Sequence, residues 1–350
     1  MRFRRGFYGL LSIVCVALAT IEGCSLVTGY DGFTGVSATA TCGPRIPANT
    51  AKPSGTAVDK GPLVGAAQTL RFFDEEGGLP PKLGLDLDEN CSTRACEARA
   101  GAPRTLGVDN VLNDFIAQLY RERDISIPAL SNGTIGLVVE VDGWNGTDND
   151  NQVFVTLFNV AGLNGSTDGG AARANDGGDL YIRRADEVGS PPVSKPLFTS
   201  PQAYVSTKKL VAPFAQVRVR LMAPTQAGVV TFDLTLLDAA VVGTIALAKG
   251  GISIPDAQLV GRVRDVEMMR VLAQLGYCAG SGSYTAIKGD ICGKIDLTDS
   301  KATDGKSLSC TSGSLAIALA ISPAKLDTVT APAPIGPFLC PMDPPDDCGR

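Results

Sequence analysis

Residues 216–221 read QVRVRL, a stretch in which Val217, Val219 and Leu221 alternate with two arginines. Successive side chains of a β-strand point to opposite faces, so this alternation predicts a strand with one apolar and one charged face. Residues 134–142 (TIGLVVEVD) show the same period of two. The other segments that predict strands are 152–158, 229–237, 243–248, 258–263 and 314–321.

Helical spacing occurs in two regions. In 109–121 the apolar residues fall three and four positions apart, and Asp109 is placed to cap the start of a helix. The second helical region is 264–293. Because no helices alternate with the strands between 134 and 263, we expect a mainly β fold over residues 67–330. The predicted architecture is an antiparallel, jelly-roll-like β-sandwich with a few peripheral α-helices and disulfide support.

The N-terminus has the order of a secretory signal peptide. Arg2, Arg4 and Arg5 precede the apolar run 10–19 (LLSIVCVALA). A helix that spans a bilayer needs about 20 apolar residues, so this run is too short to span one comfortably. Residues 1–23 are therefore predicted to be removed.

The residues that end this segment are Ile21, Glu22, Gly23 and Cys24. An aliphatic residue, then a small residue directly before cysteine, resembles the lipobox of bacterial lipoproteins. The resemblance implies a lipid on Cys24 and, with Ser25 next, an outer-membrane lipoprotein whose domain faces the periplasm or the cell surface. Apart from this motif, the chain looks similar to uncharacterised Cys-rich secreted lipoproteins. The alternative is an ordinary signal peptide that leaves Cys24 unmodified.

Residues 24–66 are rich in Gly, Ser, Thr, Ala and Pro, which predicts a lipid anchor followed by a flexible linker. Residues 331–350 form a Pro- and Cys-rich tail. An even set of cysteines in an exported chain predicts disulfides. The candidates are Cys42, Cys91, Cys96, Cys278, Cys292, Cys310, Cys340 and Cys348. Short spacing favours Cys91 with Cys96 and Cys278 with Cys292. A zinc site is disfavoured, because the chain has no CxxC pair and no histidine.

Composition excludes several function classes. The chain has 0 histidines, which excludes Ser-His-Asp and Cys-His catalysis and HExxH metal sites. A net charge of -5 argues against nucleic-acid binding. We therefore predict no enzyme and no catalytic residues. The densest acidic cluster outside the 142–151 loop is Asp86, Asp88 and Glu89 (LDLDEN), which suits a solvated loop or metal ligands better than catalysis.

The loop 142–151 (DGWNGTDNDN) crowds side-chain oxygens together. Calcium takes six to eight oxygen ligands in flexible geometry, so Asp142, Asp148 and Asp150 are candidate ligands of a structural Ca²⁺, and no other cofactor is expected. The alternative is a plain hairpin loop, since Asp, Asn and Gly also make local turn bonds. Trp144, the single tryptophan, is a candidate ligand-binding side chain or a plug for the end of the core.

Two functions remain open for the exported domain. One is a surface binding module for an envelope or extracellular glycan. The other is a structural or assembly protein of the cell envelope that binds other proteins. The low aromatic content of 6% weakens the glycan hypothesis, because sugars commonly stack on aromatic rings.

Overall fold

The computed structural model describes residues 44–51, 58–72, 83–88, 108–113, 115–116, 135–166, 179–188, 196–225, 228–304, 309–331, 339–340 and 346–349. All of them belong to one unit of the chain, Cys42–Arg350. The signal peptide and Cys24 lie outside the described residues, so the lipid anchor stays a prediction.

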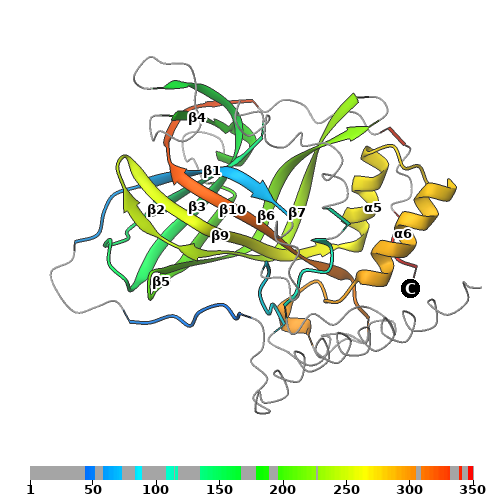
Figure 1. The fold of residues 1–350 in the computed structure, drawn as a ribbon, viewed down its shortest axis with the longest axis horizontal. Coiled ribbons are helices and arrows are strands. Elements are labelled where there is room, and N and C mark those ends of the chain that lie inside the picture. Colours follow the sequence, from blue (N-terminus) through cyan, green and yellow to red (C-terminus); the bar gives the residue numbers. More distant parts are fainter. Residues whose placement is uncertain are drawn as a thin grey trace, which may run out of the picture. The chain divides into compact units, whose positions relative to one another are not determined.

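Strands make up most of the described chain, as Figure 1 shows. They are β1 (Leu63–Arg71), β2 (Leu137–Asp142), β3 (Asp150–Ser166), β4 (Asp179–Arg184), β5 (Phe198–Ser206), β6 (Lys209–Thr225), β7 (Gly228–Thr244), β8 (Ala246–Ala248), β9 (Gly251–Arg264), β10 (Ser312–Pro323) and β11 (Lys325–Thr330). The helices are α4 (Ala185–Val188), α5 (Asp265–Gln274), α6 (Gly282–Lys294) and the short 3₁₀ helix η1 (Lys301–Thr303). The predicted mainly β class is confirmed.

Strand β3 closes the sheet on itself. One edge of β3 pairs with β2 and the other edge pairs with β5. The pairings therefore lead from β3 through β2, β1, β10, β9, β7, β6 and β5 back to β3, and all of them are antiparallel. We call these strands the ring. The predicted sandwich would have two separate facing sheets, and the pairing of β3 with β5 joins the strands into one closed sheet instead.

The long strand β3 also leaves the ring. Residues 150–157 pair with β5, whereas residues 160–166 pair with β4, and β11 extends β4 in parallel. Strand β5 begins at Phe198, opposite Leu157, and its pairs with β6 lie at 204–206 and 209–211. Strand β5 therefore does not separate β3 from β6 along the whole length of β6. We call the place where β3 and β6 face each other the seam, and side chains bridge it.

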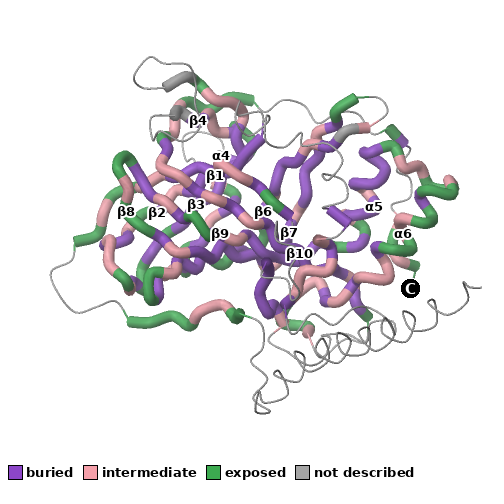
Figure 2. The backbone as a smooth tube through the Cα atoms, viewed as in Figure 1, coloured by how far each residue is buried: buried purple, intermediate pink, exposed green. Residues whose placement is uncertain are grey.

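The inside of the ring is the main apolar core. Every ring strand contributes buried side chains to one hydrophobic cluster, which includes Val217, Val219 and Leu221 of β6 and Phe232 and Leu234 of β7. Figure 2 shows buried residues along all of these strands. The strand predicted from QVRVRL is confirmed, because the stretch lies inside β6, and its two arginines pair with acidic side chains outside this cluster. Burying each such large apolar side chain stabilises the fold by about 1.5–3 kcal/mol.

Helix α5 covers part of this core and contacts β7 and β9, and α6 lies beside it (Figure 1). Met268, Met269 and Leu272 are buried in the same cluster, as their helical spacing predicts. The helix ends where Gly276 adopts a φ of +88°, and Tyr277 N–H donates back to the Leu272 carbonyl at 3.0 Å. None of the described helices is both long and apolar enough to cross a bilayer.

A short extended segment packs on the outside of the ring. Leu83, Leu85 and Leu87 are buried against Val260 of β9 and Ala316 of β10 in a second hydrophobic cluster. The alternation of leucines in this segment places Asp86 and Asp88 away from that contact. This packing determines where the acidic residues of the LDLDEN stretch lie.

The structure differs from the sequence-based boundaries at β1. This strand starts at Leu63, inside the predicted linker 24–66, and pairs with both β2 and β10. Its sequence, LVGAAQTLR, lacks a clear alternation because small residues pack on both faces. Ala67 lies in the core inside the ring and Ala66 in a different cluster. Strands β4, β5 and β11 were also not predicted.

Candidate functional site

Trp144 is buried, with 3% of its surface exposed. Its Nε1 donates to the Thr147 carbonyl at 3.1 Å, and its ring belongs to the core cluster inside the ring. The structure therefore favours the interpretation that Trp144 fills the core. In this position the indole ring does not offer a face on which a sugar could stack.

The three predicted calcium ligands of the 142–151 loop have separate partners. Asp150 is buried and accepts the N–H of Asn145 at 2.9 Å. Asp148 lies 3.8 Å from the Nζ of Lys208, and Asp142 is exposed and accepts the next backbone N–H at 2.9 Å. Among the described residues, these three carboxylates do not form a group close enough to share a metal ion. These contacts favour the alternative of a hydrogen-bonded hairpin loop.

Two disulfides join the region around α6 to the C-terminal tail. Cys278 pairs with Cys340 and Cys292 pairs with Cys348, with Cα–Cα distances of 5.1 and 5.4 Å. The predicted pairing of Cys278 with Cys292 is wrong, because most of α6 separates them and a helix of 13 residues is about 20 Å long. Cys310 is also disulfide-bonded. The candidates Cys42, Cys91 and Cys96 lie outside the described residues.

Asp86, Asp88 and Asp109 lie together, and we call these three residues the acidic group. One carboxylate oxygen from each lies within 4.8 Å of the others. A β-bridge between Leu85 and Asp109 brings the two chain segments together, and Asp109 N–H donates to the Leu85 carbonyl at 3.0 Å. The sequence indicated Asp86 and Asp88 as a cluster, whereas Glu89 lies outside the described residues.

Asp109 has a different role from the predicted helix cap. Its Oδ2 accepts the backbone N–H of Leu87 at 2.6 Å and that of Asp88 at 3.3 Å. Burial, and next the nearby Asp296 carboxylate, raise the pKa of Asp109 to about 7. Burial also raises the pKa of Asp296 to about 7, although Ser314 donates to this carboxylate. Several acidic side chains are thus held close together in a poorly hydrated place.

Polar contacts with the ring position the acidic group. Asn110 donates from Nδ2 to the Leu83 carbonyl at 3.1 Å and accepts the N–H of Ala316 at 2.8 Å. Arg262 of β9 donates to the carbonyl of Leu87, between the two aspartates, at 3.4 Å. The guanidinium of Arg262 also binds Asp304, which provides its counter-charge.

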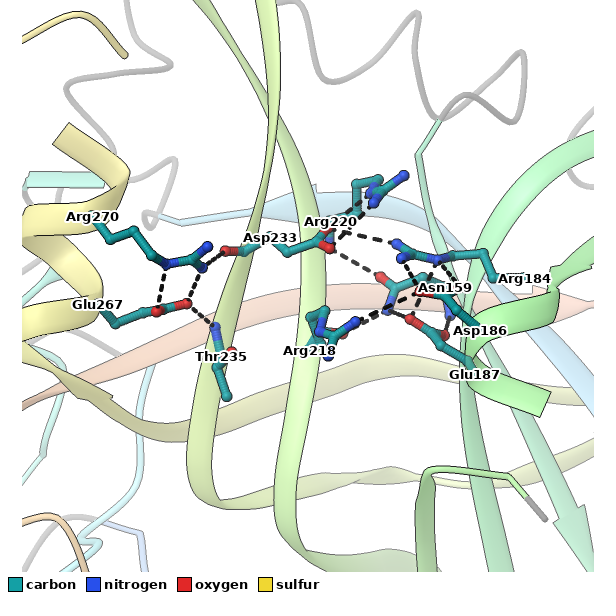
Figure 3. Close-up of polar contacts among 10 residues, drawn as sticks. All are labelled: Asn159, Arg184, Asp186, Glu187, Arg218, Arg220, Asp233, Thr235, Glu267 and Arg270. Carbon is teal, nitrogen blue, oxygen red and sulfur yellow. Dashed lines mark hydrogen bonds and ion pairs between the residues drawn. The ribbon is translucent and has the colours of Figure 1, made fainter. Parts of the chain in front are cut away.

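A second polar cluster bridges the seam between β3 and β6, as Figure 3 shows. The side-chain amide of Asn159 accepts the N–H of Arg220 at 2.9 Å and donates to the carbonyl of Arg218 at 2.7 Å. A neighbouring strand would make the same two kinds of bond. Glu187 of α4 holds the amide in place by accepting from Asn159 N and Nδ2, at 2.7 and 2.8 Å.

Buried charges continue from Asn159 along the outside of the ring. Arg184 is 1% exposed and forms a bidentate pair with Asp186 at 3.0 and 2.7 Å. It also lies 3.5 Å from Glu187 and 3.6 Å from Asp233. Asp233 in turn binds Arg220 at 2.8 and 3.2 Å. Because these charges are paired, the network joins β4, β6 and β7 rather than presenting a free charge to a substrate.

The network extends to α5. Arg270 binds Glu267 at 2.9 and 2.6 Å and donates to the backbone carbonyl of Asp233 at 3.0 Å (Figure 3). Glu267 accepts the N–H of Thr235 at 3.3 Å. These contacts hold the helix against β7. The alternation in QVRVRL indicated an outward charged face, but no sequence signal indicated that this face would be covered.

The two polar clusters differ in the chemistry that they allow. The charges of the seam network are paired with one another. In the acidic group, the raised pKa values of Asp109 and Asp296 would allow a proton to be exchanged near neutral pH. The oxygen-only set Asp86, Asp88 and Asp109 also suits a hard cation such as calcium. Comparisons of the chain with protein-family models, with curated proteins and with solved structures found no match.

Proposed function

We propose that this chain is a lipid-anchored extracytoplasmic lipoprotein whose folded unit is a structural or assembly component of the cell envelope and binds other proteins. Support for this localisation comes from the basic and apolar N-terminus followed by Ile21-Glu22-Gly23-Cys24. A lipidated cysteine with two or more acyl chains makes a stable anchor, whereas one chain is marginal.

The main support for the assembly role is that apolar side chains fill the inside of the ring and form the core. Each ring strand fills it with apolar side chains, and Met268 of α5 and Trp144 belong to the same cluster. The interior therefore stabilises the fold, and recognition would fall to the outer surface. The outer surface includes exposed apolar side chains such as Phe154 and Leu197, at 41% and 54% exposed, which suit contacts with protein partners.

The disulfides support a place outside the cytoplasm. Cys278–Cys340 and Cys292–Cys348 bind the C-terminal tail to the α6 region. Such bonds persist in oxidising compartments and are rare in the cytosol. A cross-linked unit suits a component that must keep its shape at the envelope.

Glycan binding has less support. Sugars stack on exposed aromatic faces, and the single tryptophan is buried, which leaves Phe154 as the aromatic among the exposed large hydrophobic side chains of the described residues. No contact of the described residues favours a glycan over a protein partner. We therefore keep glycan recognition as an outcome of the experiment below.

Lipidation is tested by mass spectrometry of the mature N-terminal peptide, and localisation is tested by fractionation of cells. We expect a peptide that begins at a lipidated Cys24 and a protein that fractionates with the outer membrane. The matched control, Cys24→Ser, should lose the lipid and leave the membrane fraction. A free, unmodified Cys24 in the mature protein would contradict the lipoprotein proposal.

The assembly role is tested by cross-linking in intact cells, with the Cys24→Ser variant as the control for membrane placement. One recurring protein partner that is lost in the control is the expected result. Retention on a polysaccharide column without such a partner would favour the glycan alternative. The absence of any partner would contradict the assembly role.

A further inference from the structure

We propose that the carboxylates of Asp86, Asp88 and Asp109 form a calcium site that fastens the segment 83–88 to the outside of the ring. This inference concerns a metal site and holds whether or not the assembly role is correct. It differs from the calcium site predicted in the 142–151 loop, whose carboxylates lie apart.

The geometry of the acidic group fits one bound ion. Calcium binds oxygen at about 2.4 Å, so two of its ligands are at most about 4.8 Å apart. One oxygen from each of the three carboxylates meets this limit. The three carboxylates come from two chain segments that a backbone bridge between Leu85 and Asp109 holds in register. The arrangement therefore does not depend on a single mobile loop.

A second observation concerns the side chain of Asp86. The Oδ1 atom of Asp86 is buried and has no hydrogen-bond partner, although the other oxygen accepts from Arg45 at 3.2 Å. Asp86 as a residue is only 2% exposed. A buried carboxylate oxygen without a partner is costly, because it loses its hydration without a replacement. A cation held by the same carboxylate would supply the missing interaction.

Among the described residues, the carboxylates around the group outnumber the cations. Asp86, Asp88 and Asp109 lie together, and Asp296 lies close enough to interact with Asp109. In the described part of the chain, Arg45 and Arg262 approach the segment. Arg45 is about half exposed, and Arg262 is paired with Asp304. A divalent ion would offset the repulsion that remains between the carboxylates.

The ligand type favours calcium over other common ions. Zinc sites in proteins use cysteine or histidine, and the group offers carboxylate oxygens alone. Magnesium needs nearly ideal octahedral geometry and keeps several waters, whereas calcium accepts irregular sets of carboxylate and carbonyl oxygens. Extracellular calcium modules have dissociation constants on the order of 10⁻⁴ to 10⁻³ M, and we expect this range here.

The bound ion would stabilise the outer layer of the fold. The segment carries Leu83, Leu85 and Leu87, which cover Val260 and Ala316 on the outer face of the ring. Calcium would hold the polar side of the segment while these leucines hold the apolar side. The melting temperature should therefore depend on calcium.

The test uses the full chain with its disulfides intact. Calcium binding is measured by titration calorimetry, and melting is followed in chelator and in 10 mM calcium. For the wild type we expect a saturable binding signal, a rise in Tm of about 3–6 °C, and a weaker effect of magnesium. Asp88→Asn and Asp109→Asn should each abolish the rise. The control Asp148→Asn, in the 142–151 loop, should keep it.

The variants are also informative without calcium. Asparagine keeps the shape of aspartate, so both variants should fold and should unfold cooperatively in chelator. That result shows that lost binding does not reflect lost folding. A wild type that shows no calcium binding overturns the proposal. A Tm rise that survives in both variants, or one that only Asp148→Asn removes, overturns it as well.

Discussion

The backbone N–H of Arg220 donates to the side-chain Oδ1 of Asn159 at 2.9 Å, across the seam where β5 no longer separates β3 from β6. With the bond from Nδ2 to the carbonyl of Arg218, one side chain replaces a pair of backbone bonds. The ring is thus completed at this point by an amide side chain rather than by a strand. Buried backbone groups need such partners, because an unpaired one is costly.

We expect Asn159→Ala to lower the free energy of unfolding by about 2–4 kcal/mol, because two backbone groups of β6 lose their partner and Glu187 Oε1 loses the hydrogen bond from Asn159 Nδ2. Urea denaturation measures this loss. The control is Asn164→Ala on the same strand, whose exposed side chain binds Asp327 and should contribute less than about 0.5 kcal/mol. Equal effects of the two substitutions would contradict the role of Asn159 in the seam.

Asp233→Ala tests the buried ion network. Its carboxylate is nearly buried and pairs with Arg220 and Arg184, so its removal leaves buried positive charge behind. The expected loss of stability is about 3–5 kcal/mol. Asp290→Ala removes the exposed partner of Lys294 on α6 and should cost less than about 0.5 kcal/mol. Chemical denaturation of both variants compares the buried pair with the surface pair.

Asp186 should contribute a pH-dependent part of the stability. Its hydrogen bond with Arg184 lowers the pKa of Asp186, against a smaller opposing effect of burial. Because the folded pKa is below the unfolded value of about 3.9, this stabilisation is present above pH 4 and is lost as the pH falls through the folded pKa. Asp186→Asn should reduce the loss of unfolding free energy that occurs below pH 4. The difference from the wild type should be less than about 1 kcal/mol, because the side chain of Asp186 is 39% exposed. An unchanged acid slope would contradict this.

Gly251 should not accept a side chain. A Cβ at this position would lie 2.1 Å from the carbonyl oxygen of Val64, where β9 passes β1. Gly251→Ala should therefore reduce stability by about 1–3 kcal/mol. Gly289 in the exposed face of α6 has nothing within 4 Å of its Cβ position, so Gly289→Ala should raise stability by about 0.5–1 kcal/mol. Thermal melting measures both effects. A change of Tm in the same direction for the two variants would contradict this prediction.

The disulfide pairing is tested by digestion without reduction. Linked peptides should contain Cys278 with Cys340 and Cys292 with Cys348, and a peptide that links Cys278 to Cys292 would contradict the structure. Replacing both Cys292 and Cys348 by serine should lower stability by about 2–5 kcal/mol, since the bond closes a separation of 56 residues. Urea denaturation of the double variant measures the effect.

The sequence by itself determined the local structure where the pattern was strong. The period of two in QVRVRL predicted β6, and helical spacing predicted α5, because one-sided burial leaves a regular trace in the chain. It also indicated that Asp86 and Asp88 form an acidic cluster. It did not reveal β1, since small residues such as Ala66 and Ala67 pack on both faces of that strand.

Only the tertiary structure decided how distant parts meet. The pairing of β3 with β5 closes the ring, and no residue of either strand specifies its partner by itself. The same holds for Asp109, which joins Asp86 and Asp88 although it lies more than 20 residues away. Cys278 pairs with Cys340 rather than with its neighbour in sequence, because a rigid helix separates the nearer cysteines. Contacts over such separations depend on the packing of the whole core, which local patterns do not encode.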